Sequence, residues 1–186
     1  MRKVFKALVF SLVSVSALSQ AEDVASVYEE GKNYKVISET ATDKPEVREF
    51  FSFYCGHCAS FERFIQMVKP SLDEGVFQRN HVNFLGGIPK SAQENLTEAV
   101  ALALSLENKT QQAAVIDAIF KRIHKERKRT TVYERVGVRE VFKEQGVSHV
   151  WFDENIDSVS VKAHAKEMLD IQTKMTTIKA IEGVPT

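Results

Sequence analysis

The amino-acid sequence predicts an α/β protein in which a small parallel sheet precedes a long series of helices. Residues 47–54 form a run of bulky apolar side chains, as in a strand that helices cover on both faces. A helical pattern and a second strand-like run at residues 76–85 follow, and the three make a right-handed β-α-β unit with parallel strands. From residue 91 to about residue 175, apolar residues recur at helical spacing and the strand pattern stops.

The remaining elements follow from the same periodicity. A helix is expected to start at or just after Cys55, with its regular part over residues 58–72 and a break or kink near Pro70. Residues 22–32 are expected to form a loose arm with a helical turn, and the alternation at residues 34–38 predicts a short first strand. The helices of the later block are expected at residues 92–106, 110–125, 132–145, 149–156 and 159–175.

The first residues have the composition of a secretory signal peptide. Arg2, Lys3 and Lys6 form a basic start, and residues 7–18 form an apolar stretch that is too short to cross a bilayer as a helix. Small residues stand at the two positions that a signal peptidase reads, so we expect cleavage after Ala21 and export. The alternative is an uncleaved membrane anchor.

The charge composition of the chain bears on which classes of binding partner are expected. The 186 residues carry no formal net charge, and no basic stripe is interleaved with aromatic residues, so nothing indicates a nucleic-acid partner. Residues 121–129 are locally basic. We interpret them as the solvated end of a helix, where cations suit the helix dipole; the alternative is a docking patch for a membrane partner or an acidic substrate.

The only two cysteines, Cys55 and Cys58, lie in a Cys-Gly-His-Cys motif between the strand and the helix. This order of elements is typical of a redox site. A sulfur at a helix N-terminus faces unpaired backbone N–H groups and the positive end of the dipole, and both favour the thiolate that attacks disulfides. The alternative is half of a zinc site, which needs two further ligands. No metal is expected, because no pair among the candidate histidines has finger-like spacing: His81, His124, His149 and His164.

Several motifs resemble those of the DsbA family within the thioredoxin superfamily. They are Glu-Phe-Phe-Ser-Phe-Tyr-Cys-Gly-His-Cys at residues 49–58, Phe-Glu at 61–62, His-Val-Asn-Phe-Leu-Gly-Gly at 81–87 and Gly-Val-Pro-Thr at 183–186. The resemblance covers nearly all of the chain after residue 22. It implies a thioredoxin-like fold with an inserted helical domain. The expected parts are a signal peptide at residues 1–21, a first thioredoxin-like part at 22–88, the insert at 89–175 and the remainder at 176–186.

The motif and the resemblance together assign the chemistry. Cys55 is the expected nucleophile, and Cys58 is the partner that departs first and stays buried. His57, as a cation or as a donor to sulfur, is expected to stabilise the Cys55 thiolate and so make the disulfide a stronger oxidant. The alternative is an exposed loop histidine without effect. The family usually carries proline where this chain has Gly56, and the added backbone freedom predicts a less oxidising potential.

A buried acid is the second part of the expected site. The resemblance implies that Glu49 relays protons to or from Cys58, and Arg79 in the next strand is its expected partner. The alternative is an ion pair that only satisfies a buried charge. Glu62 is expected to be solvated. The nearby phenylalanines are expected in the core rather than in a peptide-binding patch: Phe50, Phe51, Phe53, Phe61 and Phe64.

The end of the chain supplies the expected substrate contact. By itself, Gly-Val-Pro is more often a trans turn, but the resemblance implies a cis peptide before Pro185 that faces the cysteines. Val184 and Pro185 are then the substrate-binding residues, with the peptide edge of Val184 pairing with a substrate strand. The family continues with an antiparallel hairpin and a helix that this chain lacks, which would leave residues 47–54 as an edge strand. We therefore expect a truncated form of a longer protein, or a partner that supplies the missing strands.

The resemblance implies a function in the periplasm. The expected activity is that of a thiol-disulfide oxidoreductase that gives its Cys55–Cys58 disulfide to reduced exported polypeptides. A DsbB-type membrane quinone reductase would reoxidise it, and no bound cofactor is expected. One alternative is a disulfide isomerase or reductase, since Cys-Gly-His-Cys also resembles protein disulfide isomerase. The other is a truncated inactive fragment, or a peptide-binding chaperone whose cysteines are idle.

Overall fold

The computed structural model describes residues 28–186. The chain divides into a unit that ends at Glu39 and a unit that runs from Thr40 to Thr186, and each is described by itself. The predicted signal peptide at residues 1–21 lies outside the described residues, as does the first part of the predicted arm.

The described part of the first unit is a turn. An isolated bridge joins Glu30 to Tyr34, and residues 28–39 contain no strand. The strand predicted at residues 34–38 is therefore wrong. Its apolar side chains are about half exposed, with Tyr34 at 51% and Ile37 at 48%. An alternating pattern gives a stable strand only where a neighbouring strand and a core accept it.

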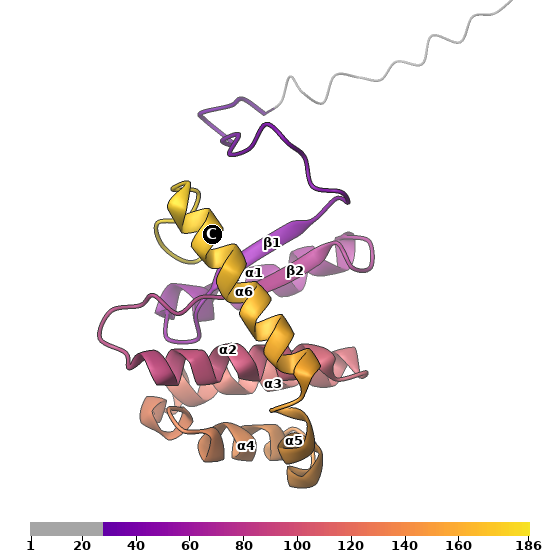
Figure 1. Ribbon diagram of the computed structural model, residues 1–186, viewed down its shortest axis with the longest axis vertical. Helices are drawn as coiled ribbons and strands as arrows, with labels where there is room; N and C mark the ends of the chain where they lie inside the picture. Colours follow the sequence, from indigo (N-terminus) through magenta and orange to yellow (C-terminus); the bar gives the residue numbers. More distant parts are fainter. Residues whose placement is uncertain (1–27) are drawn as a thin grey trace, which may run out of the picture. The chain divides into compact units, whose positions relative to one another are not determined.

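Two parallel strands form the sheet of the second unit (Figure 1). They are β1, Val47–Phe51, and β2, Phe77–His81. Both lie within the predicted strand segments and are shorter than predicted. β1 ends where the chain turns back on itself, with the Cys55 N–H donating a hydrogen bond to the Ser52 carbonyl at 3.0 Å. This turn leads the chain directly into the first helix.

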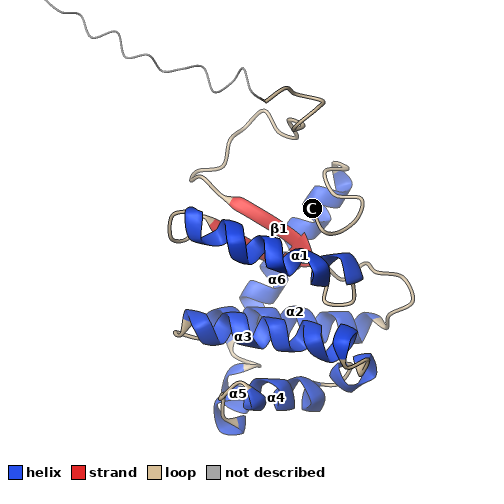
Figure 2. Cartoon of the chain, turned by 180° about the vertical axis from the view of Figure 1, so that it is seen from behind, coloured by secondary structure: helices blue, strands red, loops and turns tan. Residues whose placement is uncertain are grey.

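Helices cover both faces of the strands. α1, Gly56–Val68, starts directly after Cys55, as predicted. It continues into a 3₁₀ turn, η2, Lys69–Ser71, which contains Pro70 and is the predicted break. Figures 1 and 2 are views from opposite sides, with α1 over one face of the strands and α6, Val159–Thr177, over the other. This arrangement explains why the strand residues are apolar on both faces.

The helical block contains the segments that the sequence predicts. They are α2, Lys90–Ser105; α3, Lys109–Phe120; η3, Lys121–Lys125; η4, Arg129–Val132; α4, Arg135–Glu144; α5, His149–Asn155; and α6. The helix predicted at residues 110–125 becomes a π-helix, η3, in its last turn. α2 packs against α6 and α3, and α4 packs against α3 and α5 (Figure 1).

One hydrophobic cluster joins the end of β1 to the helical block. Phe51 and Phe53 are fully buried, and the Phe120 ring of α3 lies 4.8 Å from the Phe53 ring. Burying one such side chain contributes about 1.5–3 kcal/mol. Phe50 belongs to a second, smaller cluster. The predicted core placement is confirmed for these strand phenylalanines and is wrong for Phe64, which is 47% exposed on α1.

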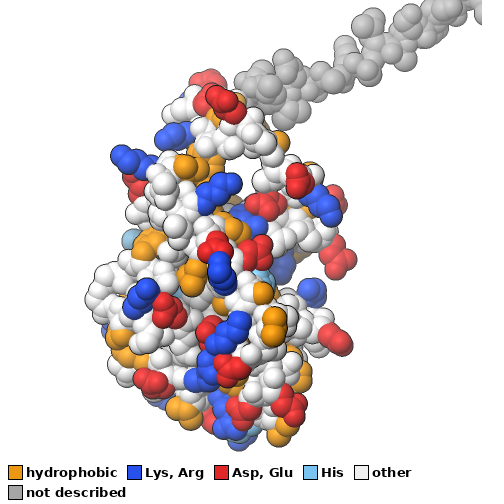
Figure 3. All heavy atoms as spheres, viewed as in Figure 1, with side chains coloured by type: hydrophobic (Ala, Val, Ile, Leu, Met, Phe, Trp, Pro, Cys, Tyr) orange, Lys and Arg blue, Asp and Glu red, His pale blue; other side chains and the backbone are white. Residues whose placement is uncertain are grey.

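Charged side chains of both signs are intermixed on the face drawn in Figure 3. This agrees with the formal net charge of zero. Some join separate helices, such as Arg135 of α4 with Glu98 of α2 at 2.7 Å. In the part of the chain that the structure describes, no helix has both the length and the apolar character needed to span a membrane.

Candidate active site

Cys55 occupies the N-cap position of α1. Its Sγ accepts a hydrogen bond from the Cys58 N–H at 3.3 Å, so the sulfur faces the unpaired N–H groups at the positive end of the helix. Cys55 is half-buried, whereas Cys58 is fully buried one turn later, and both are free thiols. A substrate can therefore reach the first sulfur more readily than the second.

The loop near residue 184 lies against Cys55. The Val184–Pro185 peptide bond is cis, and the Cys55 thiol donates a hydrogen bond to the Val184 carbonyl at 3.4 Å. Thr186 then exchanges two backbone hydrogen bonds with Phe50 of β1, at 2.7 and 3.2 Å. Within residues 28–186 the Val184 N–H has no hydrogen-bond partner. The structure thus brings the Val184–Pro185 segment to the Cys55 sulfur and leaves the Val184 N–H as a free backbone donor.

His57 and Gly56 form the exposed first turn of α1. The His57 side chain makes no hydrogen bond to the Cys55 sulfur or to any other residue within 28–186. Its predicted effect on the thiolate therefore depends on its charge and its position beside Cys55, and stays a prediction. A Cβ placed at Gly56 would meet no atom within 4 Å.

Arg79 binds two buried carboxylates. Its Nη2 lies 2.9 Å from Oε2 of Glu49, the residue opposite it in the strand register, and its guanidinium also pairs with both oxygens of Glu62. The predicted Glu49–Arg79 pair is confirmed. The prediction that Glu62 is solvated is wrong, because its side chain is only 9% exposed and turns from α1 towards Arg79. The guanidinium also lies 4.4 Å from the Phe51 ring, which fixes its position further.

Glu49 is a buried acid with a raised proton affinity. Burial raises its pKa, the Arg79 charge opposes this rise, and the Glu62 charge adds to it. Neither carboxylate oxygen of Glu49 has a well-aligned hydrogen bond within the described residues. A carboxylate without well-aligned hydrogen bonds is less stable as an anion, which favours the protonated form of Glu49.

The buried thiol of Cys58 also favours its protonated form. Burial raises its pKa, and the contact with Cys55 and the negative charge of Glu49 add to the rise, against a backbone hydrogen bond with Ser52. The Glu49 and Cys58 side chains are both buried, and the negative charge of Glu49 acts on the Cys58 thiol.

Two histidines hold the backbone of Phe53, just before the motif. The Phe53 N–H donates a hydrogen bond to Nε2 of His81 at 3.3 Å, and Nε2 of His124 donates one to the Phe53 carbonyl at 2.7 Å. His81 then carries its proton on Nδ1, which donates to Thr97 Oγ1 at 2.9 Å. Burial lowers the pKa of His81 to about 3, so its ring is neutral. The two rings fix the peptide that leads into Cys55.

Sequence reasoning missed this role of the histidines and considered them only as zinc ligands. His81 is the last residue of β2 and His124 lies on η3, and no local pattern connects either residue to Phe53. Within residues 28–186, no three or more His, Cys, Asp or Glu side chains are grouped so that they could hold a metal ion.

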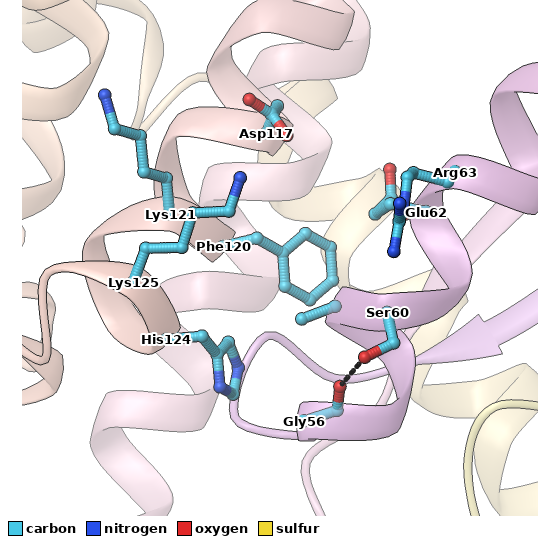
Figure 4. Close-up of a pocket in the computed structure, with 10 residues that line it drawn as sticks. Gly56, Ser60, Glu62, Arg63, Asp117, Phe120, Lys121, His124 and Lys125 are labelled. Carbon is cyan, nitrogen blue, oxygen red and sulfur yellow. Dashed lines mark hydrogen bonds between the residues drawn. The ribbon is translucent and has the colours of Figure 1, made fainter.

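A cavity of about 510 Å³ lies between α1 and the continuous helix formed by α3 and η3 (Figure 4). One wall comes from Gly56, Ala59, Ser60, Glu62 and Arg63, and the other from Asp117, Phe120, Lys121, His124 and Lys125. Figure 4 shows the Phe120 ring between the two walls. The cavity thus begins at the residue next to Cys55.

Comparison with known proteins places the chain among thioredoxin-like proteins. The family model described as a DSBA-like thioredoxin domain matches residues 46–186. The thiol:disulfide interchange protein DsbA of Pectobacterium carotovorum subsp. carotovorum is 37% identical over 186 residues, which cover 97% of this chain and 81% of the relative. The protein of the same name from Escherichia coli (strain K12) is 32% identical over 191 residues, which cover 100% of this chain and 82% of the relative.

Solved structures agree with these relatives. The disulfide oxidoreductase DsbA from Proteus mirabilis is similar with a TM-score of 0.66 and 31% identity, over 85% of this chain and 78% of that chain. Its complex with the non-covalently bound peptide PWATCDS is similar with a TM-score of 0.67 and 30% identity, over 85% and 79%. The predicted α/β fold with an inserted helical domain is confirmed.

Proposed function

The chain belongs to the family of DSBA-like thioredoxin domains, and we propose that it introduces disulfide bonds into exported polypeptides in the periplasm as a thiol:disulfide oxidoreductase. One observation carries this proposal. The Cys55 sulfur caps α1 and contacts the carbonyl of Val184, while its partner Cys58 is buried. An accessible sulfur at a helix N-terminus, next to a peptide edge and a hidden second sulfur, suits disulfide exchange.

The reaction starts from the Cys55–Cys58 disulfide. A substrate thiolate attacks the Cys55 sulfur, the bond between the two cysteines breaks, and Cys58 leaves with the electron pair and takes up a proton. A second substrate thiolate then attacks the substrate sulfur of the mixed disulfide, and Cys55 departs as a thiolate facing the N-terminus of α1. The substrate loses two electrons and forms its disulfide, and the cysteine pair gains the two electrons and becomes a dithiol.

The Val184–Pro185 edge is the proposed substrate contact. The free N–H of Val184 can donate a hydrogen bond to an extended substrate segment, and Pro185 offers no competing donor. A variant of the relative from Proteus mirabilis, with serine in place of one cysteine, binds the peptide PWATCDS, which contains one cysteine. We therefore infer that a segment around a substrate cysteine lies along Val184 when its sulfur reaches Cys55.

Two further side chains have proposed roles. Glu49 supplies the proton that Cys58 takes up on leaving, because the pKa of both groups is raised in the same buried environment. His57 stabilises the Cys55 thiolate by its charge.

Repeated turnover needs an electron acceptor outside the chain. A DsbB-type membrane quinone reductase is the proposed oxidant of the Cys55–Cys58 dithiol, which needs no bound cofactor for exchange itself. The periplasmic location depends on the predicted signal peptide, with cleavage after Ala21.

An oxidation assay tests this function. The oxidised protein is mixed in equal amounts with a reduced peptide that holds two cysteines, and the peptide disulfide is followed by mass spectrometry. We expect the peptide disulfide to form much faster with the oxidised protein than with the same concentration of oxidised glutathione. With the Cys55→Ser variant, no peptide disulfide should form. A rate no higher than that of oxidised glutathione would contradict the proposal.

A disulfide isomerase is the second candidate, because Gly56 stands where the family usually carries proline. The isomerase alternative predicts that the reduced protein rearranges the disulfides of a scrambled substrate faster than the oxidised protein forms disulfides in a reduced substrate.

A further inference from the structure

We propose that the cavity between α1 and η3 binds carboxylate side chains of the polypeptide substrate, and so favours substrates with acidic residues near the reacting cysteine. This inference rests on the proposed function, because it concerns substrates of the same two cysteines. The cavity of about 510 Å³ lies within the roughly 300–1,000 Å³ of typical ligand sites.

The cavity lies next to the nucleophile. Gly56, which directly follows Cys55, and Ala59 form part of its wall. On the opposite wall, His124 donates a hydrogen bond to the carbonyl of Phe53, which ties η3 to the segment before Cys55. A polypeptide whose cysteine has reacted with Cys55 therefore has neighbouring residues within reach of the cavity.

The charges that line the cavity are mostly unpaired cations. Arg63 comes from α1, and Lys121 and Lys125 come from η3; all three are exposed, and none has an ion-pair partner within residues 28–186. Of the two carboxylates, Glu62 is held by Arg79, and only Asp117 is unpaired. The lining therefore attracts an anionic side chain.

The other Lys and Arg residues of the basic segment do not line the cavity. Arg122, on the same π-helix, forms ion pairs with Glu126 at 3.1 Å and Glu144 at 2.6 Å. Lys128 also lies 3.7 Å from Glu126. Of the cations in residues 121–129, only Lys121 and Lys125 line the cavity, and neither has an ion-pair partner within residues 28–186.

The shape of the cavity fits an acidic side chain. Figure 4 shows Arg63 on one wall and the lysines on the other, with the Phe120 ring between them. The ring and Ala59 can pack against side-chain methylenes, while the cations bind the carboxylate. Cations around the cavity also raise the rate at which an acidic substrate associates with the protein, and salt screens this attraction.

Two matched peptides test the proposal. They share one sequence with a pair of cysteines and differ only in carrying Glu or Gln on both sides of the first cysteine. We measure the rate constant for reaction of each with the oxidised wild-type protein at low salt. Each rate is divided by the rate of the same peptide with oxidised glutathione, which removes differences in thiol reactivity. We expect a ratio of Glu to Gln rates of about three to ten, from the modest strength of exposed charge pairs.

Variants then locate the preference. The ratio should fall towards one in Lys121→Gln/Lys125→Gln and rise in Asp117→Asn, which removes the opposing carboxylate. The control is Lys143→Gln/Lys174→Gln, with the same change in net charge on exposed residues of α4 and α6 outside the cavity, and it should keep the wild-type ratio. Circular dichroism checks that each variant is folded, and added salt should lower the wild-type ratio without any substitution.

The possible results distinguish a failure of the carboxylate-binding cavity from a failure of the proposed oxidoreductase function. A wild-type ratio of one, an unchanged ratio in the cavity variant, or an equal fall in the control variant would each overturn the subsite. If the oxidised protein reacts with neither peptide, the proposed oxidoreductase function itself fails.

Discussion

The thiol of Cys55 donates a hydrogen bond to the carbonyl of Val184 at 3.4 Å, across 129 positions of sequence. The Cys58 N–H donates to the same sulfur at 3.3 Å. The sulfur thus lies between a helix N-terminus, which favours its anion, and a peptide edge along which a substrate can lie. Cys58 contributes its N–H to this arrangement while its own sulfur stays buried.

The different exposure of the two sulfurs predicts the behaviour of single-cysteine variants. Reduced Cys58→Ser, mixed with an excess of a dimer of a single-cysteine peptide joined by one disulfide, should form a lasting mixed disulfide, because Cys55 attacks, the leaving peptide thiol diffuses away, and no second protein thiol can release the adduct. Intact mass under non-reducing conditions would show the adduct. Cys55→Ser is the matched control and should stay unmodified. A peptide adduct on Cys58 in that control would contradict the assignment of Cys55 as the nucleophile.

Glu49→Gln should lower the pKa of Cys58, because it removes a negative charge that raises it. It should also slow oxidation of a reduced peptide by about tenfold to a hundredfold, because the leaving thiol loses its proton donor. The thiol titration can be followed by NMR of labelled cysteine, and the rate by quenched flow.

Glu62→Gln is the matched control for Glu49→Gln, since both carboxylates bind Arg79 and only the Glu49 charge acts on Cys58. It should leave the pKa of Cys58 unchanged or slightly higher. Equal effects of the two substitutions would reduce Glu49 to a structural ion pair.

His81 should make the fold sensitive to acid. The pKa of its ring is about 3 in the folded protein and 6.5 ordinarily. Between these values the unfolded chain binds a proton that the folded chain does not, so the free energy of unfolding falls as the pH falls from 6.5 towards 3. In His81→Gln, which can still accept from the Phe53 N–H, this part of the pH dependence should disappear in urea denaturation series. Parallel curves for the two proteins would show that His81 does not titrate on unfolding.

Gly56→Pro should fold normally and be more oxidising. Position 56 is the first residue of α1, where the backbone N–H that proline lacks has no partner within the helix, and an added Cβ would meet no atom within 4 Å. A fixed backbone that stabilises the dithiol form over the disulfide form by about 0.4–1 kcal/mol raises the reduction potential by roughly 10–20 mV for a two-electron couple. Gly56→Ala, which keeps the N–H, should change the potential less. A proline variant with an equal or lower potential would refute this explanation.

The sequence predicted the parts of the site that lie close together in the chain. The strand, the motif and the helix after it follow from periodicity, because residues 47–68 carry their own local signals. The contact of Val184 with Cys55 needed the family resemblance, since a Val-Pro pair carries no local sign of its position. The strand predicted at residues 34–38 failed because alternation cannot show whether a neighbouring strand exists.

The buried position of Glu62 and the two histidines on Phe53 were not predictable from periodicity. Glu62 lies on a helix that is exposed at the neighbouring Arg63, and only the position of Arg79 on β2 explains its burial. His124 reaches the Phe53 carbonyl from a π-helix, whose wider turn no propensity scale indicates. Each of these contacts depends on tertiary packing between distant segments.

The reduction potential of the Cys55–Cys58 pair, measured by equilibrium with glutathione, tests the central claim most directly. The start of α1 stabilises the Cys55 thiolate and therefore the reduced form of the cysteine pair. The pair should thus be more oxidising than the glutathione couple. In His57→Ala the potential should move towards that of glutathione, by roughly 20 mV for a loss of about 1 kcal/mol. A wild-type potential more reducing than glutathione, unchanged in His57→Ala, would contradict the account.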